Sequence, residues 1–143
     1  MASAHDIDGW LATDEGRRVR EAPEEAQGEL MDGSFRTMMA RTARFHRKHD
    51  FDDPISNGHD MGYRLALTME ELGEFAAAIT KGKPATDVEE ELADVLILLL
   101  GHALALRIDL ERAFHDKMDR IMRRQAKRGG LGIRVTEYGS DDS

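Results

Sequence analysis

The sequence predicts an all-α protein built on an antiparallel helical hairpin, within a four-helix bundle. Apolar side chains recur at the spacing of a helical face in four separate segments. Turn-forming residues such as Pro54, Asn57-Gly58 and Pro84 lie between these segments. No strand-rich segment, internal repeat or alternating strand and helix pattern occurs. The helices must therefore pack against one another to bury their apolar faces.

The length of 143 residues corresponds to one domain. The composition is that of a soluble globular protein, with 41% hydrophobic and 34% charged residues. The absence of cysteine excludes disulfides, thiolate nucleophiles and cysteine-based zinc sites. The net charge of −8 comes from the two ends of the chain, and residues 34–138 are electrically balanced. A broad basic surface for a nucleic acid polymer is therefore not expected.

Residues 1–33 are expected to form an acidic N-terminal arm, partly disordered, because their few apolar side chains show no sustained period. The first helix is predicted from Ser34, a suitable N-cap, to about His49. Its expected core residues are Phe35, Met38, Met39, Thr42 and Phe45.

The second helix is predicted from about Met61 to Lys81, where Gly82 and Pro84 end it. Residues 50–60 before it have the composition of a loop. Its expected core stripe consists of Leu65, Met69, Leu72, Ala76 and Ile79.

The third helix is predicted over residues 86–106, because Thr86 and Glu89 match a capping box. The fourth helix is predicted from Asp109 to about Arg128, with Leu110, Phe114, Met118, Ile121 and Met122 facing inward. The helical domain thus spans residues 34–128. Residues 129–143 are expected to form a Gly-rich C-terminal tail or a small hairpin.

Carboxylates recur at i, i+3 spacing on both helices of the hairpin. Glu71 and Glu74 share one strip of the second helix, and Glu91 and Asp94 share one strip of the third. The short connector at residues 82–86 makes the helices antiparallel, so the two pairs are expected at the same level.

Asp94 begins an apolar stretch and has almost no donor among its helical neighbours. Several ionised carboxylates together repel and raise one another's pKa. A hard divalent cation such as Mg²⁺, or Mn²⁺ in its place, resolves this because it prefers oxygen ligands and keeps positions for water and phosphate. A di-iron site is not expected, because it needs Glu-x-x-His pairs and the sequence has none.

Glu70-Glu71-x-x-Glu74 followed by Glu91-x-x-Asp94 resembles the MazG-type all-α nucleoside triphosphate pyrophosphohydrolase family. Similarity extends over about residues 35–128. The chain differs from the usual pattern at Ile121, where the family often has Asn, and at Arg107, where it often has Gly. The resemblance implies hydrolysis of a (d)NTP to the (d)NMP and pyrophosphate, with a role in nucleotide-pool house-cleaning, and with Glu71, Glu74, Glu91 and Asp94 as Mg²⁺ ligands.

Other side chains are assigned roles around a bound triphosphate. Glu70, adjacent to the ligand pair, is the candidate group that orients the attacking water or takes its proton as the catalytic base. A basic ridge on the fourth helix, formed by Lys117, Arg120, Arg124 and Arg128, offers phosphate contacts from its first three members. His46 is a candidate contact of the base or sugar, and Arg64 of phosphate or of Glu71.

Two alternatives stay open beside this interpretation. One is a phosphoribosyl-ATP pyrophosphatase, a related helical fold with similar acidic motifs. The other is a non-catalytic nucleotide-binding or regulatory module, which the departure at Ile121 keeps open.

The third helix is apolar on almost every side, so protomers are expected to share a core. The resemblance to the family implies that they associate as a homodimer or a dimer of dimers. The longest uncharged apolar run, Val95–Leu106, is too short to span a bilayer, so no membrane association is expected. The N-terminal sequence lacks the pattern of a secretory signal, so a cytoplasmic location is the default.

Overall fold

The computed structural model describes residues 35–135. Residues 1–34 and 136–143 lie outside the described part, and with them the N-terminal arm, the predicted cap at Ser34 and the end of the C-terminal tail. The described elements are, in chain order, α3 (Phe35–Lys48), the 3-10 helix η2 (Pro54–Ser56), α4 (Met61–Thr80), α5 (Ala85–Leu106), α6 (Leu110–Met122), β1 (Ala126–Gly129) and β2 (Gly132–Val135).

The described part of the chain is mostly helical, as the sequence predicts for an all-α fold. The chain divides into two compact units, the first ending at Asp109 and the second beginning at Leu110. Between residues 35 and 135, no helix is both long and apolar enough to cross a membrane.

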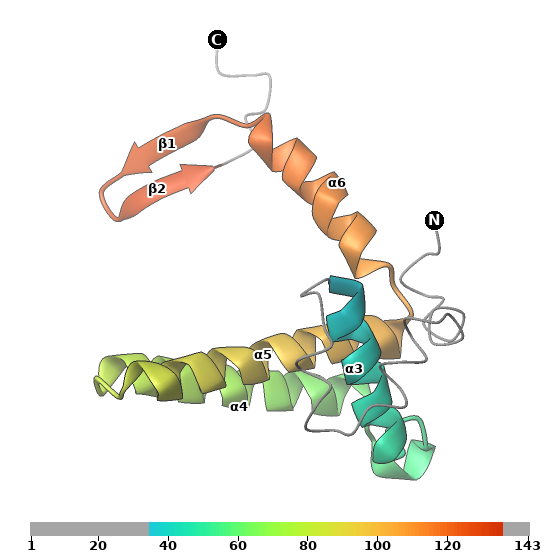
Figure 1. Cartoon of the computed structure of the whole chain (residues 1–143). Helices are drawn as coiled ribbons and strands as arrows, with labels where there is room; N and C mark the ends of the chain where they lie inside the picture. Colours follow the sequence, from blue (N-terminus) through green and yellow to red (C-terminus); the bar gives the residue numbers. More distant parts are fainter. Residues whose placement is uncertain (1–34, 136–143) are drawn as a thin grey trace. The chain divides into compact units, whose positions relative to one another are not determined.

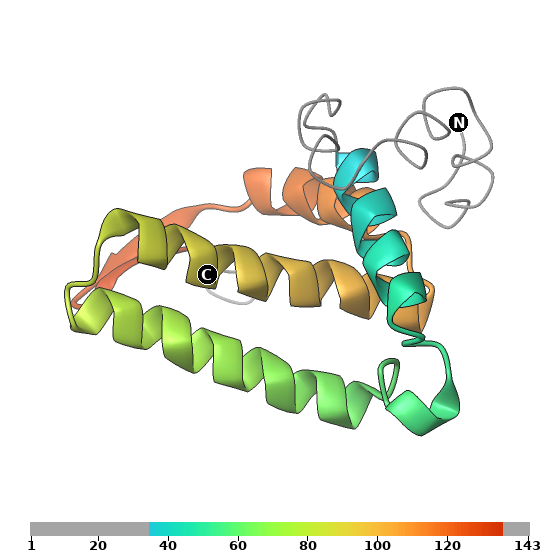
Figure 2. The same cartoon turned by 60° about the horizontal axis from the view of Figure 1, so that its bottom comes forward.

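The first unit is dominated by the hairpin of α4 and α5, which lie side by side and antiparallel (Figures 1 and 2). The Asp60 side chain caps α4 by accepting a hydrogen bond of 2.8 Å from the Tyr63 backbone N–H. Gly82 follows the end of α4 with a φ of 62°, a conformation that glycine adopts without steric cost. The predicted end of the second helix at Gly82 and Pro84 is therefore confirmed.

The predicted capping box at the start of α5 is wrong. Pro84 occupies the N-cap position, and no side chain caps the helix there. The Thr86 hydroxyl instead lies 3.4 Å from Oδ1 of Asp87. Because proline fixes its own φ and cannot continue a preceding helix, it defines this boundary without a side-chain cap.

The predicted core stripe of α4 is also wrong for the single chain. Leu65, Met69, Leu72, Ala76 and Ile79 are all exposed, and Met69 keeps 69% of its accessible surface. The face of α4 that packs against α5 instead carries the buried residues Arg64, Thr68 and Ala78. The rule that the most apolar stripe faces the core of its own chain thus fails here.

Helix α3 crosses α5 and supplies much of the small core of this unit (Figure 2). Met39 is its largest fully buried side chain, and Thr42 is buried as expected. Met38 and Phe45, both predicted to be in the core, are exposed instead. The buried apolar residues of the described chain are Met39, Ala40, Ala43, Ala78, Val95, Leu100 and Ala103.

A buried arginine joins the hairpin to the loop that precedes it. Arg64, only 2% exposed, donates from Nη1 to the carbonyl oxygen of Gly58 at 2.9 Å. Its Nη2 donates to the carbonyl oxygen of Leu98 at 3.1 Å, and its Nε donates to Nδ1 of His102 at 3.0 Å. One guanidinium therefore binds α4, α5 and the 50–60 loop together, and fixes the register between the two helices.

The histidine partner of this arginine has its tautomer set by the surrounding bonds. Because Nδ1 of His102 accepts from Arg64, its Nε2 carries the proton. That Nε2 lies 2.8 Å from the Thr68 hydroxyl oxygen, and the hydroxyl in turn donates to the Arg64 carbonyl oxygen at 2.8 Å. All three side chains thus form one satisfied interior network.

The turn after α5 explains why a glycine suits the position of Arg107. Arg107 caps α5 with a φ of 55°, in the left-handed region. Its backbone N–H bonds the carbonyls of Ala103 and Leu104. A non-glycine residue accepts this conformation at a cost of roughly 1–2 kcal/mol.

The second unit consists of α6 and a two-stranded antiparallel sheet. Helix α6 ends at Met122, well before the predicted end at Arg128. The backbone N–H groups of Arg123 and Arg124 each donate a hydrogen bond to the carbonyl three residues earlier, which closes the last turn. Strands β1 and β2 then pair with Arg128 opposite Ile133. Gly132, with a φ of 139°, accommodates the return of the chain. Arg128 therefore lies on a strand and not on the predicted basic ridge.

Substitution of Gly101 by Ala should destabilise the protein. A methyl group at this position of α5 would overlap Nη2 of Arg64 and lie 2.8 Å from Nε2 of His46. Because both groups are held by hydrogen bonds, we expect a loss of about 1–3 kcal/mol in the free energy of unfolding, measured by denaturant titration.

Gly73→Ala in α4 is the matched control. A methyl group there meets no atom within 4 Å, so the higher helix propensity of alanine should leave stability unchanged or raise it by up to about 1 kcal/mol. Equal stability of the two variants would contradict the described packing around Arg64.

Candidate functional site

Three carboxylates from the two helices of the hairpin converge on one point. An oxygen atom from each of Glu71, Glu91 and Asp94 lies within 4.8 Å of the others. Glu71 and Glu91 are half-buried and Asp94 is exposed, so the group lies at the surface with access to solvent. The register of α4 against α5 therefore produces the facing arrangement that the helical spacing predicts.

The charges of this cluster act against one another. The pKa of Glu71 is raised, first by burial and then by the charges of Asp94, Glu74, Glu91 and Glu70. The pKa of Glu91 is also raised, by burial and by Glu74 with which it shares a hydrogen bond, although Lys83 opposes the shift. Glu74 thus lies beside Glu91, outside the set of three, and Glu70 lies within electrostatic reach of Glu71.

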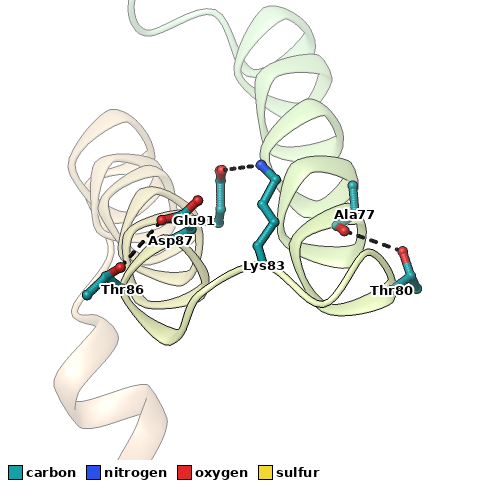
Figure 3. Close-up of polar contacts among 6 residues, drawn as sticks. All are labelled: Ala77, Thr80, Lys83, Thr86, Asp87 and Glu91. Carbon is teal, nitrogen blue, oxygen red and sulfur yellow. Dashed lines mark hydrogen bonds and ion pairs between the residues drawn. The ribbon is translucent and has the colours of Figure 1, made fainter.

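A lysine that the sequence reasoning missed reaches this cluster. Lys83 lies in the connector between the helices, and its Nζ is 3.9 Å from Oε1 of Glu91 (Figure 3). The same view shows that Thr86 and Asp87 form their contact with each other in the first turn of α5. The signal in the sequence was a cation in a short connector, two turns from an acidic pair.

The side chains of the cluster suit a divalent cation. The converging donors are carboxylate oxygens, which Mg²⁺ and Mn²⁺ prefer. The raised pKa values of Glu71 and Glu91 show that the folded chain disfavours their charged forms in the absence of a cation. A bound cation would reverse this penalty, so the residues fit such a group.

His46 and Arg64 lie in the interior, where each has hydrogen-bond partners from other segments of the same chain. His46 is 5% exposed, and its Nδ1 is 2.9 Å from Nε2 of His59. Arg64 uses its guanidinium to bind α5 and the loop, as described above. The positions of both side chains favour a structural role over contact with a ligand.

Burial and nearby positive charge keep these histidines neutral. The pKa of His46 is lowered to about 4, first by burial and then by the charges of Arg64 and His59. The pKa values of His59 and His102 are lowered too, again first by burial and then by Arg64. Protonation at these positions would place a second positive charge beside a buried guanidinium.

The basic residues predicted to contact phosphate belong to the second unit. Lys117 and Arg120 lie one turn apart on α6, and Arg124 lies in the turn that follows the helix. Their role toward a substrate stays a prediction.

Comparison with known proteins supports the resemblance inferred from the acidic motifs. Residues 63–129 match the family model described as the MazG nucleotide pyrophosphohydrolase domain. The matched segment contains α5, α6 and nearly all of α4, and therefore every carboxylate of the cluster. The resemblance is thereby confirmed over this segment. Neither the curated proteins nor the solved structures gave a match.

The contribution of His46 to the stability of the folded protein should fall as the pH falls from 7 to 5. An unfolded histidine, with a pKa near 6.5, binds a proton in this range, whereas folded His46, with a pKa of about 4, does not. The slope of the unfolding free energy against pH is proportional to the number of protons taken up on unfolding. His46→Gln should reduce this uptake by up to about one proton. Denaturant titrations at several pH values would measure this slope.

His115→Gln on α6 serves as the control, since His115 is exposed and lies outside this network. The carboxylate cluster acts in the opposite direction, because its raised pKa values favour the folded state as the pH falls. The difference between the two variants cancels that contribution. If His46→Gln left the slope as steep as His115→Gln, the buried neutral state of His46 would be wrong.

Proposed function

From the match of residues 63–129 to the MazG nucleotide pyrophosphohydrolase domain, we propose that this chain is a Mg²⁺-dependent nucleoside triphosphate pyrophosphohydrolase. The reaction converts a (d)NTP and water to the (d)NMP and pyrophosphate. The observation that carries the proposal is the convergence of Glu71, Glu91 and Asp94 from α4 and α5, inside the matched segment.

The cation would be held by Glu71, Glu91 and Asp94, with Glu74 beside Glu91 as the fourth carboxylate. When bound, a divalent cation compensates the charge of the triphosphate and favours ionisation of water. Without such compensation, an acidic cluster would repel a substrate that carries about four negative charges.

Glu70 is the proposed base. It is exposed and adjacent to Glu71, and its charge contributes to the raised pKa of Glu71. Its carboxylate can orient a water molecule and take its proton as the water oxygen attacks phosphorus. The bond to the pyrophosphate oxygen then breaks, and pyrophosphate leaves.

Lys83 and the basic residues of the second unit are the proposed phosphate contacts. Lys83 lies near Glu91 and can exchange this carboxylate for a phosphate oxygen when substrate binds. Lys117, Arg120 and Arg124 remain candidates because they are cationic and lie within the segment that matches the family model. We assign His46 and Arg64 to the support of the hairpin.

We further propose that a second copy of the chain covers the exposed apolar faces of the hairpin. Large apolar side chains at helical spacing remain exposed on both helices, which is unusual for a monomer. They are Leu65, Met69, Leu72 and Ile79 on α4, and Leu92, Leu96, Leu99 and Leu106 on α5.

Light scattering should therefore give a mass of at least two 16.1 kDa chains. Met69→Glu places a charge on this face and should lower the mass, because the charge would have to be desolvated in the interface. Ile55→Glu, at a position that is 90% exposed on η2, should leave the mass unchanged. A single-chain mass for the unmodified protein would contradict this assembly.

Pyrophosphate release from canonical and modified dNTPs and NTPs tests the activity. We expect release with Mg²⁺ or Mn²⁺ and none with EDTA. Glu74→Gln and Asp94→Asn should each reduce turnover by more than about 100-fold, because each removes a charged oxygen ligand. Their helical circular dichroism should be retained.

Glu90→Gln is the control in the same helix, since Glu90 is exposed and lies outside the cluster. It should retain activity. Folded protein that releases no pyrophosphate from any substrate, with either metal, would contradict the proposed reaction. Full activity in both Glu74→Gln and Asp94→Asn would contradict the assignment of the ligands.

A further inference from the structure

Strands β1 and β2 form an antiparallel hairpin in the second unit (Figure 1). The hairpin carries three cationic side chains and no acidic one: Lys127 and Arg128 on β1, and Arg134 on β2. The proposed hydrolysis gives none of these three a role. Strand β2 also lies beyond residue 129, where the match to the family model ends. The charge of the hairpin therefore needs an explanation of its own.

The balanced charge of residues 34–138 hides an uneven distribution along the chain. Residues 35–109, the described part of the first unit, carry 13 acidic and 9 basic side chains. Residues 110–135, the described part of the second unit, carry 3 acidic and 8 basic side chains. The expectation that no basic surface forms rested on the average over both units. The second unit by itself suits an anionic partner.

The register of the hairpin places cations on both of its faces. Lys127 pairs with Arg134, so these two side chains leave the same face. Arg128 pairs with Ile133, and this pair lies on the opposite face. Like charges directly opposite each other destabilise a pair of strands. An anion in contact with both Lys127 and Arg134 would remove this repulsion.

The hairpin buries none of its own side chains, since every residue of both strands is exposed. A two-stranded hairpin alone is only marginally stable in water. Its turn consists of Gly130 and Leu131, and the Leu131 side chain is fully exposed. The hairpin thus offers a partner charged contacts along its length and an apolar contact at its tip.

The partner that this arrangement fits has negative charge on two sides of a groove. A flat anionic surface, such as a membrane, meets one face of a hairpin only, and a second copy of the hairpin would bring like charges together. The major groove of B-form DNA is about 12 Å wide, admits a two-stranded ribbon and has phosphates along both walls. The major groove of A-form RNA is too narrow to do so.

We propose that the β1–β2 hairpin binds duplex DNA by inserting into its major groove. Lys127 and Arg134 face the phosphates of one strand, and Arg128 faces those of the other. Leu131 at the tip reaches the floor of the groove, where thymine methyl groups offer an apolar contact. This binding is independent of the proposed hydrolysis and needs no metal.

Fluorescence anisotropy of a short labelled DNA duplex, titrated with the full chain in EDTA, tests the proposal. EDTA removes the divalent cations, so the result does not depend on the carboxylate cluster or on turnover. The logarithm of the association constant should fall linearly with the logarithm of the salt concentration. Three phosphate contacts predict a slope of about −3.

Arg128→Gln combined with Arg134→Gln should weaken binding at least about fivefold and make the slope shallower by about 2, because two phosphate contacts are lost. Replacement of the same two residues by lysine keeps the charges and should retain most of the affinity. Leu131→Ser should weaken binding without changing the slope, since it removes an apolar contact and no charge.

The control is Arg41→Gln combined with Lys81→Gln. It also removes two positive charges, but from exposed positions of the first unit. Its salt dependence should match that of the unmodified chain. If this control lost as much affinity as the glutamine pair in the hairpin, the net charge of the chain would account for the binding and the proposal would be overturned.

Three further results would overturn the proposal. The first is an unchanged anisotropy at low salt with the folded, unmodified chain. The second is an equal loss of affinity in the lysine and glutamine pairs, because charge at Arg128 and Arg134 would then not explain binding. The third is tighter binding to duplex RNA or to vesicles that contain phosphatidylserine, since the groove of DNA would then not be the preferred partner.

Discussion

The buried guanidinium of Arg64 is the interaction on which the arrangement of the first unit depends. It joins α4 to the carbonyl of Leu98 on α5 and to the loop at Gly58, and this sets how the two helices align. Glu71 lies two turns after Arg64 on α4. On α5 the guanidinium packs against Gly101, and Asp94 lies two turns before this glycine. A slip of one turn would separate the carboxylates. The network that holds the arginine thus positions the acidic cluster without touching it.

The cost of this arrangement is electrostatic. The cluster gathers like charges at the level where the helices face each other, and the raised pKa values of Glu71 and Glu91 record the repulsion. Hydrogen bonds in the interior and the packing of α3 must offset it in the free chain. A cation would remove the penalty at its source, so the proposed affinity for metal would come from the same feature that weakens the free fold. Stability and the proposed function would then oppose each other at this point of the hairpin.

Local chemistry predicted the helices well, because their limits depend on nearby residues. Gly82 and Pro84 end α4 as expected, and the 3.6-residue period predicted that Glu71 and Asp94 face each other, as their converging oxygen atoms do. The predicted core stripe of α4 failed because apolar periodicity shows which face is hydrophobic, and not which surface will cover it. The interior role of Arg64 was missed for a related reason, since its partners lie on α5 and in the loop. Helix α6 was predicted too long because the pairing of β1 with β2 competes with helix formation at residues 126–129.

The central claim is that the hairpin of α4 and α5 binds a divalent cation through its facing carboxylates. A titration with Mn²⁺, followed by electron paramagnetic resonance, tests it directly because only the free ion gives the sharp aqueous spectrum. We predict that the unmodified chain removes this signal until its sites are filled, and that Asp94→Asn leaves far more Mn²⁺ free. A signal that grows in proportion to added Mn²⁺ from the first addition, with folded and unmodified protein present, would contradict the claim.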